Sequence, residues 1–353
     1  MNRFDAVRRI LAQATAARTF PAAAVEVGHA DGAIWQDAVG RLTYDANASP
    51  ARLDTIFDLA SLTKVIATTS LAMRHVEQAT LALTDRVADR IPDWRGADRA
   101  LATLADLLEH ASGLTAHLAL FRDHAGRADF QAGICGRPLD YPPRTASIYS
   151  DLGFILLGFM LEDVVQEALA IQFDRLAGDL GLGDLRFLPP QTWRQRTAPT
   201  AHSAWRGRLL VGEVHDENAW ALGGTAGHTG LFGSVEAVGR FARLVLRTLT
   251  GDDCGLGHPA TLARFVRRST VRGTSRARGW DTMLTTSSCG HRLSASAIGH
   301  TGFTGTSLWI DPTRDLYVVL LTNRVHPSAV GDAIQTLRPA VHDAIVDAVS
   351  SAS

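Results

Sequence analysis

The sequence has little cysteine, no excess of charge of either sign and no long apolar run. Its three cysteines, Cys135, Cys254 and Cys289, lie far apart without a C-x-x-C pair, so neither a zinc site nor a disulfide framework is indicated. Lys and Arg number 35 against 36 Asp and Glu, which leaves no basic field to attract nucleic acid or an anionic membrane. No window reaches the roughly 18 apolar residues of a transmembrane helix. These absences favour a small-molecule or peptide ligand.

The N-terminal segment also lacks a targeting signal. MNRFDAVRRILAQATAARTF carries charges spread through an amphipathic pattern, without the uninterrupted apolar stretch and cleavage site of a secretory signal peptide. We therefore expect a cytoplasmic protein, or a periplasmic one if a signal peptide was removed from this sequence. Internal repeats and low-complexity tracts are missing as well, and the sequence leaves the oligomeric state open.

Strand patterns occupy the two ends of the chain. Residues 22–39 form two short apolar runs joined by an Asp-Gly pair, which is a strong hairpin signal. Residues 306–323 predict a second hairpin that turns at 311–315, and residues 294–302 could supply the strand before it. Together these segments predict one antiparallel sheet built from distant parts of the chain.

Helical patterns fill the middle of the chain and follow the second hairpin. Apolar periodicity predicts helices over 103–112, 152–169, 235–249 and about 328–350, the last with Pro339 as a kink or a boundary.

The predicted fold is therefore α+β, an antiparallel sheet flanked by helices with a helical domain inserted in it. We expect a discontinuous sheet domain made of residues 1–85 and 270–353, and a mainly helical insert made of residues 86–269.

A chemically usable pair, Ser61 and Lys64, lies at the start of the apolar segment ASLTKVIATTSLAM. Residues three apart on a helix share a face, so the hydroxyl and the amine should point the same way. A partly desolvated lysine has a lowered pKa and can take the proton of a serine. At a helix N-terminus the backbone N–H of the serine is also free to bind an oxyanion. The S-x-x-K spacing alone is a weak signal, because both residues are common.

Two further motifs follow in order. Y-S-D begins at Tyr149, before a strongly apolar helical pattern, and H-T-G begins at His300, before a predicted strand hairpin. With S-x-x-K they resemble the S-x-x-K, S-D-N and K-T-G signature of serine β-lactamases and penicillin-binding proteins. The resemblance is greatest to the branch of class C β-lactamases, D-alanyl-D-alanine peptidases and esterases, in which the second motif starts with Tyr. It covers about residues 20 to 325 and implies a β-lactamase-like fold.

The resemblance implies a role for each motif residue. Ser61 would be acylated, and Lys64 would orient and help deprotonate it. Tyr149 would complete the proton relay, provided that Lys64 lowers its pKa from about 10. The backbone N–H groups of Ser61 and Phe303 would form the oxyanion hole. Gly302, without a Cβ, would let the substrate lie against the strand edge.

Two departures from the family pattern affect the predicted substrate contacts, which are Asp151, His300, Thr301 and Gly302. His300 replaces the usual Lys, and a largely neutral imidazole gives a weaker positive field for a β-lactam carboxylate. Asp151 replaces the usual Asn, and its charge should raise the pKa of Lys64. Asp151 either turns away to cap the following helix, or contacts Lys64, a substrate N–H or a free amine.

Two other segments have competing interpretations. Residues 211–234 are rich in Gly and hold His215, Asp216 and His228, but fit no phosphate-loop pattern, so we expect a structured loop lining the cleft rather than an ion site. Residues 266–280 are rich in Arg, which indicates either a solvated surface or an anion-binding wall for a carboxylate-bearing substrate.

Arg324 is a separate candidate for binding an anionic group. The sequence thus predicts a serine hydrolase that forms an acyl-enzyme with a D-peptide, an ester or a β-lactam-like substrate, with weak β-lactamase activity and no metal or cofactor. The alternative is a non-hydrolytic protein that binds peptidoglycan fragments or other acyl ligands. Transfer of the acyl group to an acceptor other than water is a third option.

Overall fold

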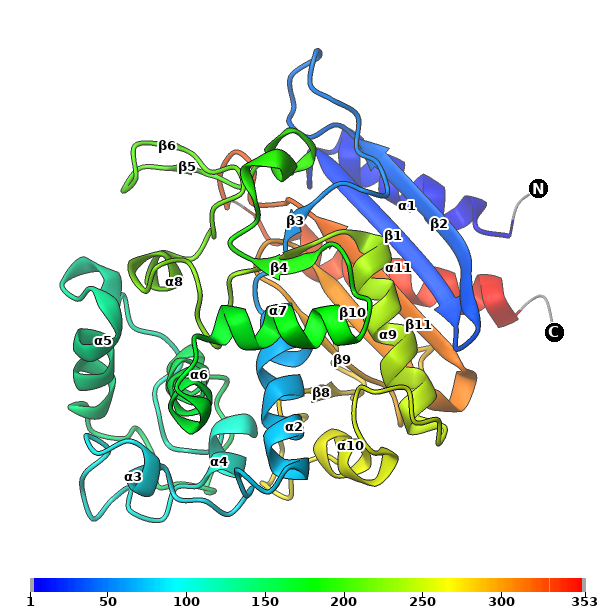
Figure 1. Cartoon of the computed structure of the whole chain (residues 1–353). Helices are drawn as coiled ribbons and strands as arrows, with labels where there is room; N and C mark the ends of the chain where they lie inside the picture. The colour runs from blue at the N-terminus through cyan, green and yellow to red at the C-terminus, as the bar shows by residue number, and fades with distance from the viewer. Residues whose placement is uncertain (1–2, 330, 351–353) are drawn as a thin grey trace.

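The computed structural model describes residues 3–329 and 331–350. Its centre is an antiparallel sheet with the strand order β2-β1-β11-β10-β9-β8, built from both ends of the chain (Figure 1). Its strands are β1 (Ala22–His29), β2 (Gly32–Gly40), β8 (Asp281–Thr282), β9 (Ile298–Thr301), β10 (Ser307–Asp311) and β11 (Leu316–Thr322). The N-terminal hairpin joins the C-terminal one through β1 and β11, where Val25 lies opposite Leu320. The predicted sheet and both of its hairpins are confirmed.

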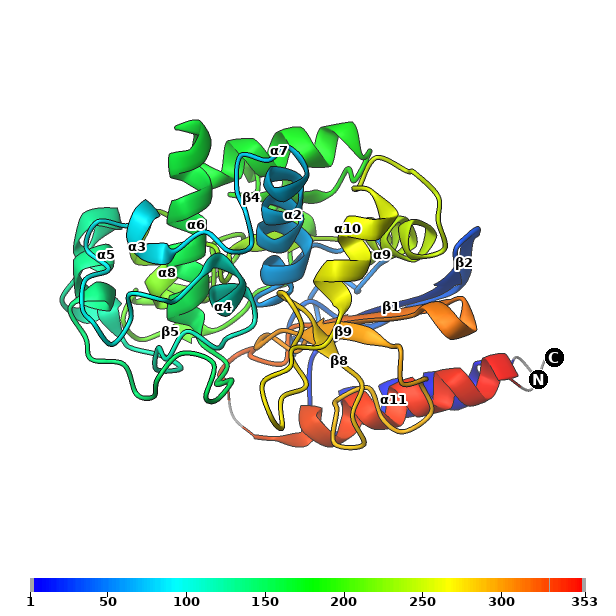
Figure 2. The ribbon, with the colours of Figure 1, turned by 90° about the horizontal axis from the view of Figure 1, so that it is seen from below.

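Both faces of this sheet are buried, and the side chains of each strand alternate between two cores. In β1, Val25 and Val27 face one core and Ala22 and Ala24 face the other, as the period of two in a strand requires. Helices α1 (Asp5–Ala16) and α11 (Ala333–Ser350) lie against each other and cover one face (Figure 2). Helix α9 (Val235–Leu249) packs on the other face.

The rest of the chain forms helices and short strands on the α9 side of the sheet (Figure 1). The remaining helices are α2 (Ser70–Glu77), α3 (Val87–Arg90), α4 (Leu104–Leu108), α5 (Gly126–Cys135), α6 (Asp151–Val165), α7 (Leu169–Asp179), α8 (Glu217–Ala221) and α10 (Pro259–Val266), with short turns η1 (Lys64–Thr69), η2 (Leu120–Arg122), η3 (Gln191–Arg196) and η4 (Pro312–Arg314). A small sheet has the order β3-β7-β4, and β5 pairs with β6. These strands are β3 (Phe57–Asp58), β4 (Leu185–Phe187), β5 (His202–Ser203), β6 (Arg208–Leu209) and β7 (Leu231–Gly233). Residues 152–161 of α6 are all buried, which explains why this helix is apolar around its whole circumference.

The predicted helices differ from the observed ones mainly at their ends. The pattern over 235–249 matches α9, whereas α4 stops within the predicted 103–112. The single helix predicted over 152–169 is in fact the helix α6 and the start of α7. They are separated at Gln166, whose left-handed backbone (φ 53°) ends α6. Pro339 lies inside α11 and is not its boundary.

The division into residues 1–85 with 270–353 and residues 86–269 stays a prediction, and α9, which falls in the second part, packs on the sheet. Across the described ranges, each helix is too short or too polar to cross a membrane.

Candidate active site

The three motifs meet at one cavity of about 670 Å³. Its wall includes Ser61 from the S-x-x-K motif, Tyr149 and Asp151 from the second motif, and the segment 300–303 from the third. One side of the cavity is formed by the starts of the η1 and α6 helices, and the other by the end of β9 and the turn after it. We refer to them as the helical wall and the strand wall.

Ser61 lies in a tight turn between β3 and the first helical residues. The residue before it, Ala60, has a left-handed backbone with φ 47°, which is unusual for a residue that carries a Cβ. The buried carboxylate of Asp58 holds this turn, since its Oδ1 accepts the N–H of Ala60 at 2.9 Å. The helix that follows begins with the π-helical segment η1, and such segments often occur at functional sites.

The structure brings the predicted relay residues into direct contact. The Tyr149 hydroxyl donates to Ser61 Oγ at 2.8 Å, and Lys64 Nζ donates to the same oxygen at 3.0 Å. Lys64 Nζ also donates to Asp151 Oδ1 at 2.8 Å and to the carbonyl of His228 at 3.0 Å. The fully buried ammonium group therefore has an acceptor for each of its three N–H bonds.

The pKa shifts of Lys64 and Tyr149 show which of these groups are charged. Burial acts to lower the pKa of Lys64, but the neighbouring Asp151 and Tyr149 outweigh it, and the net pKa is raised. Burial also raises the pKa of Tyr149, even though the Lys64 ammonium opposes this. The raised pKa of Lys64 is the effect expected of the carboxylate that replaces the family's Asn, whereas the expected lowering of the Tyr149 pKa is wrong. At rest the site holds an ammonium, a carboxylate and a neutral phenol.

Asp151 contacts the lysine and does not cap the helix. The cap of α6 is Ser150, whose Oγ accepts the N–H of Gly153 at 3.3 Å. Burial acts to raise the pKa of Asp151, but the neighbouring Lys64 and His117 lower it below its usual range. The carboxylate therefore stays ionised, with His117 Nδ1 3.7 Å from its second oxygen.

His300 lies in β9 on the strand wall, where its ring is buried and tilted 5.8 Å from the ring of Tyr149. Burial, together with the charges of Arg276 and Lys64, lowers the pKa of His300 well below its usual value, so the ring is neutral as predicted. Its Nδ1 lies 2.8 Å from the carbonyl of Thr301 and must be the protonated nitrogen. Among the described residues nothing bonds to Nε2, which remains an acceptor.

The turn after β9 presents backbone N–H groups to the cavity. Neither Ser61 nor Phe303 donates its backbone N–H within residues 3–329 and 331–350, as an oxyanion hole requires. Gly302 precedes Phe303, and the structure gives a second reason for a glycine there besides the predicted contact with substrate. A Cβ at this position would lie 2.1 Å from Thr306 Oγ1 and 2.6 Å from the carbonyl oxygen of Leu59. Glycine is needed for packing against Leu59 and Ala60, the residues that precede Ser61.

Three arginines also line the cavity. Arg276, from the arginine-rich segment, lies 4.9 Å from the ring centre of Tyr149, and Arg324 lies 4.8 Å from that of Phe303. Arg324 also donates to the carbonyl of Phe303 at 2.8 Å. Arg338 of α11 donates to the carbonyl of Gly302 at 2.6 Å, and burial lowers its pKa to about 10. Sequence analysis missed Arg338, because α11 is remote in the chain and has no motif.

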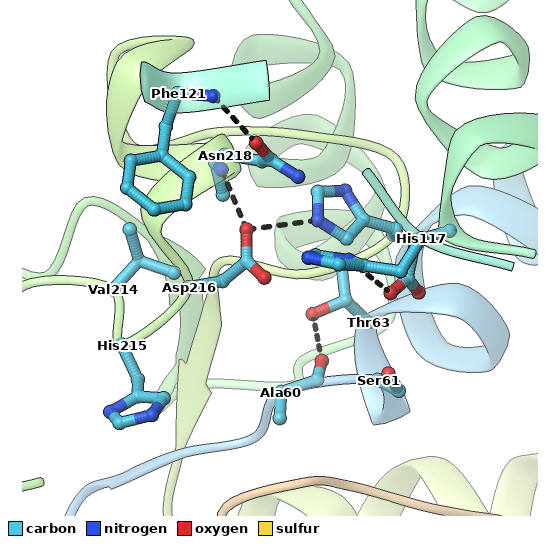
Figure 3. Close-up of polar contacts among 12 residues, drawn as sticks. Ala60, Ser61, Thr63, His117, Phe121, Val214, His215, Asp216 and Asn218 are labelled. Atoms are coloured by element: carbon cyan, nitrogen blue, oxygen red, sulfur yellow. Dashed lines mark hydrogen bonds and ion pairs between the residues drawn. The ribbon is translucent and has the colours of Figure 1, made fainter. Parts of the chain in front are cut away.

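The glycine-rich segment 211–234 lines the helical side of the cavity as a structured loop. Asp216 caps α8 through the N–H of Ala219 and lies 3.1 Å from His228 Nε2. Figure 3 shows this carboxylate above Ser61, with Asn218 behind it accepting the N–H of Phe121 at 3.0 Å. Within the described residues, no group of three or more His, Cys, Asp or Glu side chains is arranged to hold a metal ion.

The sequence holds one further signal for the pair of Ser61 and Lys64. Lys64 is the only lysine among 353 residues, whereas arginine supplies every other basic side chain except histidine. A chain that uses arginine everywhere else and lysine once has a chemical reason for the exception. Lysine can lose its proton in a protein and arginine cannot.

Comparison with known proteins identifies similar chains. A model of the family described as Beta-lactamase matches residues 7–340. A Salmonella agona (strain SL483) protein named "Putative D-alanyl-D-alanine carboxypeptidase" is 31% identical over 313 residues, which are 78% of this chain and 71% of that protein.

Two solved structures are similar in fold. EstCE1, described as a hydrolase with promiscuous acyltransferase activity, superposes with a TM-score of 0.76 at 22% identity, over 96% of this chain and 98% of its own. Simvastatin synthase (LovD) from Aspergillus terreus has a TM-score of 0.75 at 19% identity, over 98% of both chains.

Proposed function

The chain belongs to the beta-lactamase family and is a serine hydrolase of amides or esters, and on that premise we propose that Ser61 is its nucleophile and Lys64 with Tyr149 its proton relay. The observation that carries this proposal is the pair of hydrogen bonds, 2.8 and 3.0 Å long, from Tyr149 and Lys64 to the Oγ of Ser61. A hydroxyl with two such neighbours can pass its proton on as it attacks a carbonyl carbon.

Lys64 and Tyr149 act as one coupled base. The pair must lose one proton before it can accept that of Ser61, and amine with phenol or ammonium with phenolate are equivalent forms of that state. The accepted proton then goes to the leaving amine or alcohol, and the acyl group remains on Ser61 until water releases it. The N–H groups of Ser61 and Phe303 would stabilise the negative oxygen in both steps.

We propose a peptide with a C-terminal D-amino acid as the substrate. The name of the Salmonella relative supports this class, and Arg276 beside Tyr149 is a candidate for binding the terminal carboxylate. His300 adds no positive charge because it is neutral. A β-lactam carboxylate therefore lacks the charge of the family's usual lysine and depends on the arginines of the cavity, in keeping with weak β-lactamase activity.

Mass spectrometry after incubation with a reactive ester and with a fluorescent penicillin tests the proposal. We expect a covalent adduct on Ser61 with the ester, turnover of that adduct, and release of D-alanine from a D-Ala-D-Ala peptide. The Ser61→Ala variant is the control and should remain unlabelled. Failure of every probe to label Ser61 would instead support a non-hydrolytic binding protein.

A further inference from the structure

A second cavity, of about 590 Å³, lies on the far side of the arginine-rich segment and shares no lining residue with the active site. Five arginines from three parts of the chain line it. They are Arg144 from the loop before Tyr149, Arg264 from α10, and Arg267, Arg268 and Arg278 from the segment after α10. We call this cavity the arginine groove.

Only two of these five charges are neutralised within the groove. Asp106 accepts two hydrogen bonds of 2.8 Å from Arg144, and Glu109 lies 3.0 Å from Arg278. The nitrogens of Arg268 donate to neutral acceptors, the hydroxyl of Thr282 and the carbonyl of Met283.

Arg264 and Arg267 form no side-chain ion pair within residues 3–329 and 331–350, and both are exposed. Three positive charges therefore face one concave surface of a chain whose formal net charge is −1.

These cations also act on one another. Burial lowers the pKa of Arg278, and the charges of Arg267 and Arg264 lower it further against the pull of Glu109. The Nε of Arg278 is buried without an acceptor. Uncompensated cations and a buried N–H donor without an acceptor, gathered on one concave surface, are suited to binding an anion.

We propose that the arginine groove binds a phosphate-bearing anion of at least two negative charges. Guanidinium groups bind phosphate oxygens through paired N–H bonds, and several of them surrounding one concave site can share a dianion. The exposed hydroxyl groups of Thr84 and Thr270 on the rim can add neutral hydrogen bonds. The phosphate group could belong to a free metabolite or to a lipid head group, and the chemistry of recognition is the same.

Calorimetric titration with inorganic pyrophosphate tests this site, with the ionic strength matched by chloride. We expect saturable one-to-one binding by the unmodified chain. The double variant Arg264→Ala/Arg267→Ala should bind at least about tenfold more weakly, because it loses two of the three uncompensated charges. The double variant Arg9→Ala/Arg52→Ala removes the same charge from exposed positions elsewhere and should bind as the unmodified chain does.

A second arm identifies the source of the phosphate. Co-sedimentation with phosphatidylcholine vesicles, with and without phosphatidic acid, whose phosphate monoester can carry two negative charges, reports binding to a lipid head group. Either pyrophosphate binding or vesicle binding that disappears in Arg264→Ala/Arg267→Ala supports the proposal.

No binding in either arm, or equal binding by both double variants, would overturn it. Neither arm requires catalysis, so the outcome is independent of the proposed hydrolase activity. A circular dichroism spectrum equal to that of the unmodified chain would show that each variant is folded.

Discussion

The two walls of the active-site cavity differ in how many of their polar atoms are already bonded. On the helical wall, Lys64, Asp151, Tyr149 and the hydroxyl of Ser61 bond to one another, so that the charges are balanced before any substrate arrives. On the strand wall, the N–H of Phe303 and the Nε2 of His300 have no partner among the described residues. In the proposed mechanism the helical wall controls protons, and the strand wall retains the hydrogen-bonding groups that a substrate can use.

The largest effect is expected from removing the centre of the helical wall. Lys64→Met deletes the ammonium that contacts Ser61 and Asp151, so the relay loses its base, and we expect kcat/KM to fall about 10,000-fold. Acylation measured with a p-nitrophenyl ester checks this. A loss of less than about tenfold would mean that Lys64 is not part of the base. Circular dichroism should show a folded variant.

A smaller loss is expected from disturbing the strand wall without changing any charge. The Cβ of Gly302→Ala would collide with Thr306 and with the backbone of Leu59, so the turn that carries the Phe303 N–H must move. We expect kcat to fall about 100-fold, the cost of one lost oxyanion donor. Gly178→Ala is the matched control, because a Cβ there contacts nothing within 4 Å. Equal activity of both variants would exclude an oxyanion role for this turn.

The charge balance of the helical wall can be tested with Asp151→Asn. The carboxylate raises the pKa of Lys64, so its removal should lower that pKa and shift the alkaline rise of kcat/KM to lower pH. At neutral pH we expect a gain of up to about tenfold. Because Lys64 is the only lysine, NMR of protein labelled at lysine Nζ shows a single side-chain signal whose titration gives the pKa directly. An unchanged titration would contradict the proposed pairing.

The smallest effect concerns Asp58, a buried carboxylate at the lining of the same cavity. Burial raises the pKa of Asp58 from 3.8 to about 6, against the N–H bonds from His215 and Ala60, which lower it. The folded chain therefore binds more protons than the unfolded chain between about pH 4 and pH 6. Asp58 therefore makes the free energy of unfolding fall as the pH rises from about 4 to about 6. Above about pH 6 the contribution of Asp58 is constant.

Asp58→Asn removes that contribution. Urea unfolding at several pH values should show a flatter dependence between about pH 4 and pH 6 in the variant than in the unmodified chain. The comparison uses the difference between the two proteins, because other carboxylates titrate in the same range. Identical slopes would mean that Asp58 does not titrate there.

The sequence predicted the elements whose signals are local. The apolar alternation of β1 and β11 and the amphipathic period of α9 depend on near neighbours, and so do the spacings of the three motifs. The prediction that those motifs converge on one site came from the family resemblance, since no rule about neighbouring residues places Tyr149 beside Ser61.

The parts that the sequence did not predict depend on tertiary contacts. The charge of Lys64 follows from how Asp151 is oriented, and the need for Gly302 follows from the position of Leu59. The sequence did not distinguish the arginines of segment 266–280, but in the fold Arg276 lines the active-site cavity and Arg267 and Arg268 line a separate groove. In each case the burial of the side chain and the direction in which it points determine its role, and neither can be read from neighbouring residues.

The pairing of β1 with β11 has a consequence for biosynthesis. A ribosome releases the N-terminal hairpin first, and one edge of β1 then has no partner until the segment 316–322 emerges. The strand that carries His300 and the turn that carries Phe303 are synthesised only shortly before the segment 316–322. The nascent chain therefore gains its sheet and its oxyanion-binding turn together, and an incompletely synthesised chain can neither close its core nor cleave a substrate.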